Sequence, residues 1–360
     1  MDPQPQPENK GVRRPQISAK NTRRLKVLGT ALTVGGVGLF AYFVYSVGLR
    51  EIADNIENFG IFGFLVILAI YAVRILMRSL AWKLSVYEPY SLTLRDTVPA
   101  VIIGEAMSSM IPLGILISGT AKAVAVRKKL PLVVGLSSVA TENLFYSFTT
   151  SLFLILGALT FVRSYTLDEG TTITIDVLIG AIVLVVIFLL LLIIRQWHFA
   201  SETCEWMYQN GWFSHLLEHG RLQVRLFENL IYGFYRRYPR RFLPICVFET
   251  AFHVLGVIEV WFILSRLISS SGHFLNAFLL ESVSRLITIV FKLIPFLVGV
   301  DEAGAQFIAE TAAIGVGIGV TLAIIRKGRI LFWTAIGIVL IVRRGLTLRE
   351  IQRAGDGEED

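Results

Sequence analysis

The chain has 360 residues, of which 54% are hydrophobic and 17% are charged, and its mean hydropathy is +0.65. This is more apolar surface than a soluble domain of this size buries, so we expect membrane lipid to solvate part of the chain. The net charge of +7 does not indicate nucleic-acid binding, because Lys and Arg cluster at the ends of apolar runs, where they orient membrane helices.

The amino-terminal part of the chain predicts a basic arm followed by two crossings. Residues 1–24 are rich in Pro, Gln and basic side chains and predict a disordered cytoplasmic arm. The apolar run 27–47 lacks a small-residue cleavage site and therefore predicts a retained crossing rather than a signal peptide. Few positive charges follow it, which places its end on the far side of the membrane, and 61–82 predicts the return crossing.

The segment 97–126 is too polar and too broken to be an ordinary crossing. It contains Glu105, Pro112, Gly119 and Lys122, and basic residues flank it on both sides. The basic flanks predict that the chain enters and leaves on the same side. A Pro- and Gly-broken backbone at membrane depth needs protein or a water-filled cavity to cover it, so we predict a re-entrant helical hairpin with its tip near residues 112–119.

Two further predicted crossings, 132–161 and 173–194, precede a strongly basic loop at 195–241. In this loop apolar residues at helical spacing alternate with arginines, which predicts an amphipathic helix lying on the inner leaflet. The next predicted crossing is 242–268. A final, short crossing at 330–342 leads to a cytoplasmic tail at 346–360.

A second broken segment, 274–319, has the same form as the first. Each contains an apolar helix with an acidic residue, then Ile-Pro at 111–112 or 294–295, then a glycine-bearing stretch. Another ionisable residue lies downstream of each Pro, Glu142 in the first half and Arg326 in the second. We expect the first hairpin to open inward and the second outward, as in inverted-repeat transporters, whose sites lie where broken helices meet near the midplane.

The predicted fold is therefore an all-α integral membrane protein with about six transmembrane helices plus two re-entrant helical hairpins in an inverted repeat. Its transmembrane domain spans residues 25–345, and the charge pattern places both termini in the cytoplasm. We expect a bacterial or archaeal cytoplasmic membrane.

Ionisable residues inside apolar segments are the best guide to function, because a charge at mid-bilayer costs about 2.5 to 3.5 kcal/mol on insertion scales. Glu281, Arg285 and Lys292 fall on one helical stripe that leads to the second break, and they predict a site for an anionic headgroup. The alternative is a buried Glu281 and Arg285 pair one turn apart, with Lys292 reaching toward the membrane surface.

Two other groups of charged residues leave alternatives open. Arg74 and Arg78 lie one turn apart and either meet a phosphate or, the favoured reading, reach toward the inner membrane surface. Glu105 and Lys122 lie on opposite arms of the first hairpin, where they either pair with each other or face a cavity with Glu142.

The sequence does not predict catalysis, a metal or a cofactor. Glu249, His253 and Glu259 would suit a proton relay or half of a metal site, but no second ligand pair accompanies them. Cys204 and Cys246 form no disulfide framework. Nucleophile elbows, phosphate loops, dinucleotide-binding glycines and zinc-protease motifs are all missing from the sequence.

The two breaks resemble those of the flippase-like transmembrane family, which is the membrane-domain family of lysylphosphatidylglycerol synthases, as in multiple peptide resistance factors. The similarity covers about residues 25–345. The first family signature is matched by Pro112, Gly119, Lys128 and Glu142, and the second by Pro295, Gly299, Glu302 and Arg326. The chain departs from the family pattern at Phe296 and Leu297, where a glycine pair is usual, and at Asn143, where an arginine commonly follows the acid. These departures bear on headgroup identity rather than on the fold.

The resemblance implies a lipid translocator that moves a polar or cationic headgroup between leaflets, in a stand-alone form without the lysyl-transferring domain. Its expected partners are membrane phospholipids or other polar lipids. The candidate headgroup-binding residues are Glu105, Pro112, Gly119, Lys122, Glu142, Glu281, Arg285, Lys292, Pro295, Gly299, Asp301, Glu302 and Arg326.

Two alternatives remain. The first is a non-transporting membrane partner that docks a lipid- or glycolipid-modifying enzyme through the basic loop 195–241, with the hairpins serving only the structure. The second is an integral membrane transferase that uses a cavity carboxylate as a base. The predicted transport runs down a lipid gradient or is coupled to ions.

Overall fold

The structure is a computed structural model that describes residues 42, 45, 49–110, 114–165, 169–195, 199–209, 214–268, 273–291, 294–315 and 317–344. The predicted first crossing at 27–47, the amino-terminal arm and the tail at 346–360 therefore lie outside the described residues. Within the described ranges every regular element is a helix.

The helices fall into two groups of four that have the same order along the chain. The first group is α2 (Leu49–Leu84), α3 (Leu94–Met110), α4 (Gly114–Ala125) and α5 (Leu132–Ser164). The second group is α9 (Pro239–Leu267), α10 (His273–Val290), α11 (Val300–Thr311) and α12 (Ile318–Arg343). Between the groups lie α6 (Glu169–Arg195), α7 (Phe199–Gln209) and α8 (Ser214–Arg237).

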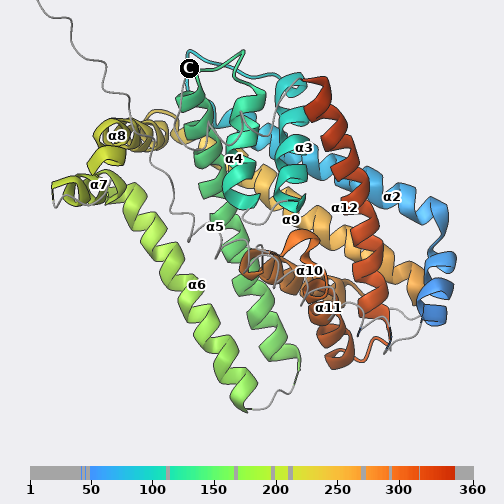
Figure 1. The fold of residues 1–360 in the computed structure, drawn as a ribbon. Coiled ribbons are helices and arrows are strands. Elements are labelled where there is room, and N and C mark those ends of the chain that lie inside the picture. The colour runs from blue at the N-terminus through green and yellow to red at the C-terminus, as the bar shows by residue number, and fades with distance from the viewer. Residues whose placement is uncertain are drawn as a thin grey trace, which may run out of the picture.

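The two groups pack against each other reciprocally. The two first helices, α2 and α9, pack together and run obliquely through the molecule (Figure 1). Helix α12 of the second group packs on α3 of the first, and helix α5 of the first group packs on α10 of the second. The last helix of each group therefore packs against the second helix of the other group.

Each group contains one pair of short helices. Helices α3 and α4 have 17 and 12 residues, and α10 and α11 have 18 and 12 residues. At 1.5 Å per residue the shorter member of each pair is about 18 Å long, less than the ~30 Å of bilayer hydrocarbon. The two members of each pair pack together, and a 3-10 turn at Pro295–Leu297 in the second pair contacts α3.

The turn of the second hairpin has an unusual backbone. Phe296 and Leu297 have φ angles of 54° and 51°, and Gly299, just before α11, has 83°. A left-handed conformation costs a residue with a Cβ atom roughly 1–2 kcal/mol. The two positions where the resemblance led us to expect a glycine pair are therefore positions where the chain turns through left-handed geometry.

The protein is an integral membrane protein, and its longest helices have the length and composition of membrane spans. Three described helices meet both criteria, at Ile52–Leu84, Leu132–Ser164 and Pro239–Leu267, and a shorter apolar stretch covers Thr172–Phe188. Large apolar side chains such as Leu65, Leu156 and Leu184 are exposed on the outside of the bundle. Exposed apolar side chains on membrane-length helices are what lipid contact requires.

The predicted short crossing at 330–342 was wrong in its start, because α12 begins at Ile318. Arg326, Lys327 and Arg329 interrupt the apolar run before the predicted start. Inside the bundle Arg326 and Arg329 are buried against carboxylates of other helices, so the helix continues through them.

The predicted amphipathic helix in the basic loop corresponds to α8. Ile231 and Phe234 on this helix are buried and pack with Phe145 and Ile245 of α5 and α9. The basic residues Arg225, Arg236, Arg237 and Arg240 are exposed in this region. The loop also contains α7, which the sequence pattern did not predict.

Helices α11 and α12 approach closely at Gly319, which gives a test of the packing. A Cβ atom at this position would lie 2.4 Å from the carbonyl oxygen of Ala305. We expect Gly319→Ala to lower the stability by about 1–3 kcal/mol, because the backbone of α11 has to shift. Thermal unfolding of the detergent-solubilised protein, followed by circular dichroism, measures this change.

Gly180→Ala on α6 is the matched control, because a Cβ atom there meets nothing within 4 Å. Its higher helix propensity predicts equal or slightly greater stability. Equal melting temperatures for the two variants would contradict the close packing of α11 and α12.

Candidate functional site

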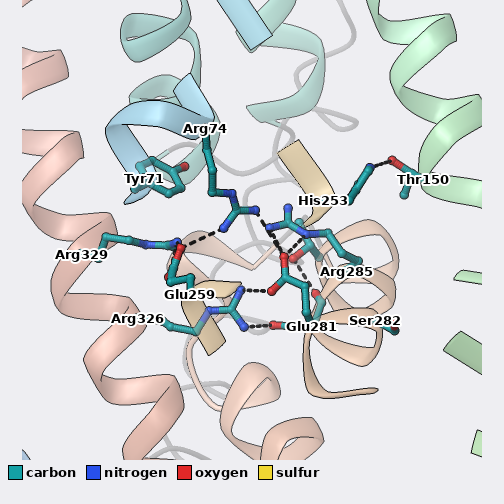
Figure 2. Close-up of polar contacts among 12 residues, drawn as sticks. Tyr71, Arg74, Thr150, His253, Glu259, Glu281, Ser282, Arg285, Arg326 and Arg329 are labelled. Atoms are coloured by element: carbon teal, nitrogen blue, oxygen red, sulfur yellow. Dashed lines mark hydrogen bonds and ion pairs between the residues drawn. The ribbon is translucent and has the colours of Figure 1, made fainter. Parts of the chain in front are cut away.

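Two fully buried carboxylates form the centre of an ionic cluster that joins four helices. Arg74 on α2 donates from Nη1 to Glu259 Oε2 of α9 at 3.0 Å, and from Nη2 to Glu281 Oε1 of α10 at 3.3 Å. All three side chains have no exposed surface. Figure 2 shows Arg74 lying between the two carboxylates.

Three more arginines complete this set, which we call the arginine cluster: Arg74, Glu259, Glu281, Arg285, Arg326 and Arg329 (Figure 2). Arg285 Nη2 lies 2.7 Å from Glu281 Oε1, and Arg326 Nη2 lies 2.8 Å from Glu281 Oε2. Arg329 donates to both oxygens of Glu259. One carboxylate, Glu281, thus binds arginines from α2, α10 and α12.

A short hydrogen-bond chain adds a third acid to this cluster. Arg326 Nη1 donates to Ser284 Oγ at 2.9 Å, and Ser284 Oγ donates to Asp301 Oδ1 at 2.6 Å. Asp301 lies in the first turn of α11, where the positive end of the helix dipole favours a carboxylate. Ser284 of α10 therefore links Arg326 of α12 to Asp301 of α11.

A second buried group lies entirely in the first four-helix group. We call it the Glu142 cluster, and it comprises Arg78, Glu105, Lys122 and Glu142. Glu142 on α5 binds Arg78 Nη2 at 2.7 Å and Lys122 Nζ at 3.3 Å. The second nitrogen of Arg78, Nη1, is 3.8 Å from Glu105 Oε1, and Tyr71 donates a hydrogen bond to Glu105. Arg78 therefore links the carboxylates of α3 and α5.

A cavity of about 170 Å³ lies between the two clusters. Its charged lining residues are Arg78, Glu105, Arg285, Asp301, Arg326 and Arg329. Ser109, Ser118 and Thr288 add hydroxyl groups, while Phe252 and Trp333 supply apolar wall. Side chains from both four-helix groups thus enclose one polar cavity.

Aromatic rings cover the faces of several of these guanidinium groups. The Arg329 carbon Cζ is 4.1 Å from the centre of the Tyr71 ring, and those of Arg74 and Arg78 are 4.4 Å and 4.5 Å from the rings of Phe252 and Tyr146. Such cation–π contacts are attractive and place each guanidinium against an aromatic face. They also fix the planes of the guanidinium groups.

The structure places the predicted site residues in three zones. Glu105, Arg285, Asp301 and Arg326 line the cavity. Glu142 and Glu281 are buried and form ion pairs with the cavity residues Arg78 and Arg285. Lys122 is buried beside Glu142, with which it pairs. Pro112 and Lys292 lie outside the described residues.

Three more predicted residues, Pro295, Gly299 and Glu302, lie at or after the turn of the second hairpin. Glu302 Oε2 accepts a hydrogen bond of 2.8 Å from the Gly299 backbone nitrogen, and its other oxygen pairs with Lys327 of α12. These contacts fix the start of α11. Gly119 lies on α4, where a Cβ atom would meet Val139 of α5 at 3.5 Å.

The prediction that Arg74 and Arg78 reach toward the membrane surface was wrong. Arg74 is fully buried, and Arg78 pairs with Glu142. Both guanidinium groups are instead bound to buried carboxylates. Arg74 contacts Glu259 of α9 and Glu281 of α10, and Arg78 contacts Glu142 of α5. The direct pair between Glu105 and Lys122, one of two alternatives, was also wrong, because Lys122 binds Glu142.

Sequence reasoning did not single out Arg329 or connect it with Glu259. One feature of the sequence could have indicated this pair. Arg329 follows an apolar run, and a charge exposed to lipid is costly, so a buried acidic partner was to be expected. The pair of Glu281 and Arg285, which the sequence offered as the alternative to a headgroup site, is present as a contact of 2.7 Å, and the same Arg285 lines the cavity.

Comparison with known protein families gives a match to most of the chain. The family model described as lysylphosphatidylglycerol synthase TM region matches residues 26–337. The searches of curated proteins and of solved structures gave no match.

The central position of Glu281 gives a stability test. Glu281→Gln removes the negative charge that Arg74, Arg285 and Arg326 share. We expect a loss of about 3–5 kcal/mol, the usual cost of leaving buried charges without a partner. Thermal unfolding in detergent measures this loss.

Glu310→Gln is the control, because Glu310 is exposed and contacts only the neighbouring turn of its own helix, at Gln306, among its described contacts. An unchanged melting temperature in Glu281→Gln would show that the arginine cluster does not hold the helices together.

Proposed function

Since the chain belongs to the family of lysylphosphatidylglycerol synthase transmembrane regions, we propose that it moves the polar headgroup of a membrane lipid between leaflets through the central cavity. The observation that carries this proposal is the cavity itself, which is polar and is built from both halves of an integral membrane protein. Charged groups at this depth are costly unless they serve a pathway or pair with one another.

The arrangement of the hairpins supports a transport mechanism. We infer that α3 with α4 and α10 with α11 are re-entrant hairpins of an inverted repeat, which enter the membrane from opposite sides and meet at the cavity. The reciprocal packing of α12 on α3 and of α5 on α10 supports this inference. In transporters with inverted repeats, one unit rocks against the other and opens the midplane site to each side in turn.

The size of the cavity favours a headgroup over a whole lipid. A volume of about 170 Å³ corresponds to about six water molecules at ~30 Å³ each. A phosphate with a small substituent fits this space, whereas acyl chains do not. We propose that the tails stay in the bilayer while the headgroup passes through the protein.

The proposed transmembrane arrangement keeps six crossings, with both termini in the cytoplasm. The membrane is proposed to be a bacterial or archaeal cytoplasmic membrane, and the protein is proposed to act without enzymatic chemistry of its own. The basic surface near α8 supports the orientation, because exposed arginines are typical of the cytoplasmic side.

Arg285 provides the test of this function, because its guanidinium lines the cavity while Glu281 keeps two other arginines. The Arg285→Ala variant is therefore expected to fold but to bind an anionic headgroup less well. A charge-assisted hydrogen bond contributes about 1.5–3 kcal/mol, so we expect the transbilayer rate to fall by about tenfold or more. The measurement is the movement of fluorescent phospholipids in vesicles that contain the purified protein.

Arg266→Ala is the matched control, because Arg266 is exposed at the end of α9 and outside the cavity lining. It should move lipid like the wild type. Wild-type protein that moves no phospholipid of any headgroup tried would reject the transport function.

A docking function is the second candidate, and the exposed arginines Arg225, Arg236 and Arg240 favour it. Deleting the segment is unsuitable as a test, because Ile231 and Phe234 of α8 pack in the core. Replacing the three arginines with glutamate keeps that packing. If a lipid-modifying enzyme no longer co-purifies while lipid movement is unchanged, docking is established. If the enzyme still co-purifies and lipid movement is unchanged, docking through these arginines is excluded.

A further inference from the structure

One buried carboxyl group differs from all the others around the cavity. Glu249 on α9 has no exposed surface, and neither of its oxygens accepts a hydrogen bond from the described part of the chain. The other described acids without exposed surface, Glu142, Glu259, Glu281 and Glu302, each pair with at least one basic side chain. Glu249 therefore has no cation of its own.

The surroundings of Glu249 explain this difference. The groups that interact with it are the Glu142 carboxyl on α5, the Arg78 guanidinium on α2, the Lys122 ammonium on α4 and the Cys246 thiol one turn earlier on α9. His253 lies one turn further along α9, where it contacts Thr150 at 3.0 Å and stacks on Phe153 and Tyr146. Arg78 and Lys122 both point their charges at Glu142.

Two adjacent buried carboxyl groups with this pattern hold one proton between them. An ionised carboxylate buried without a donor is strongly unfavourable, whereas a protonated one donates a hydrogen bond to its neighbour. Glu142 is the neighbour that can accept this bond, because α5 packs on α9 here and Tyr146 stacks on His253, each one turn beyond the two acids on its own helix. The proton belongs to the pair rather than to one residue.

The charge balance of the whole region fits this assignment. Its basic residues are Arg74, Arg78, Lys122, Arg285, Arg326 and Arg329, and its other acids are Glu105, Glu142, Glu259, Glu281 and Asp301. With a proton on the Glu142 and Glu249 pair, the basic residues exceed the ionised acids by one charge. One negative charge, that of a phosphodiester headgroup, then neutralises the region.

We propose that Glu142 and Glu249 form a proton-binding site that is coupled to headgroup occupancy of the cavity through Arg78. The coupling rests on the proposed transport function, whereas the proton site stands without it. Arg78 is the link because it binds Glu142, lies 3.8 Å from Glu105 and lines the cavity.

The coupling follows from the two states of the pair. When the proton leaves, a second negative charge appears beside Arg78 and holds its guanidinium at Glu142 and Glu249. When a proton binds, an O–H bond forms on the pair, this hold weakens, and Arg78 is available to a phosphate in the cavity. An anionic headgroup and a proton therefore enter together and leave together, with no net charge moved.

The proton site is tested by infrared spectroscopy of the purified protein at neutral pH. We expect the carbonyl stretch of a protonated carboxylic acid in the wild type and its loss in Glu249→Gln. Glu142→Gln should lose the same band although Glu249 is still present, because Arg78 and Lys122 then stabilise Glu249 as a carboxylate. Glu310→Gln, on the exposed face of α11, should keep the band.

A band that is missing in the wild type, or that persists in Glu249→Gln, would overturn the proton site. A band that is lost in Glu249→Gln but kept in Glu142→Gln would overturn the shared proton. Elution of each variant as a single folded species in size-exclusion chromatography excludes misfolding as the cause.

The coupling is tested in phosphatidylcholine vesicles that contain a trace of fluorescent phosphatidylglycerol and carry an imposed pH gradient. For one proton per lipid, a gradient of one unit should enrich the lipid about tenfold in the leaflet that faces the alkaline side. Glu249→Gln should abolish this enrichment, and Glu310→Gln should keep it.

Wild-type movement without any response to the gradient would overturn the coupling and leave the transport function intact. No movement at all would reject the transport function and the coupling together, and the infrared result would then decide the proton site by itself.

Discussion

The shared carboxylate of Glu281 is the interaction on which the rest of this structure depends. It receives arginines from α2, α10 and α12, and Arg74 extends the contact to Glu259 and so to α9. The backbone of α9 makes room for this arrangement at Gly256, where a Cβ atom would lie 2.3 Å from Glu281 Oε1. Four helices from both halves of the chain are thus tied to one buried anion.

Such an arrangement is a costly way to stabilise a protein. Removing an ion from water costs several kcal/mol even in real protein interiors, and pairing offsets this cost only when the geometry is good. Apolar residues of similar volume would hold the helices together more cheaply. The proposed function accounts for the charges, because a lipid headgroup that leaves the interfacial water needs a polar path across the membrane.

The two pairs of short helices show how the backbone contributes to the cavity. Helix α3 brings Glu105 and Ser109 to the cavity, and α10 and α11 bring Arg285 and Asp301. At the second tip, Phe296 and Leu297 adopt left-handed backbone angles that glycine would adopt without strain. The surrounding contacts, including the pair of Glu302 with Lys327, hold this turn in place.

The sequence alone determined the class of the protein and much of its plan. Apolar runs of membrane length, basic flanks and two similar Pro- and Gly-bearing breaks predict a helical membrane protein and the family to which it belongs, because these features depend on spacing along the chain. The tertiary structure decided which charges meet. Arg74 and Glu281 are distant in sequence, and Arg329 was not singled out at all, since an ion pair between helices depends on their packing and rotation. For the same reason the isolation of Glu249 is visible only in three dimensions, where Arg78 and Lys122 are both bound to Glu142.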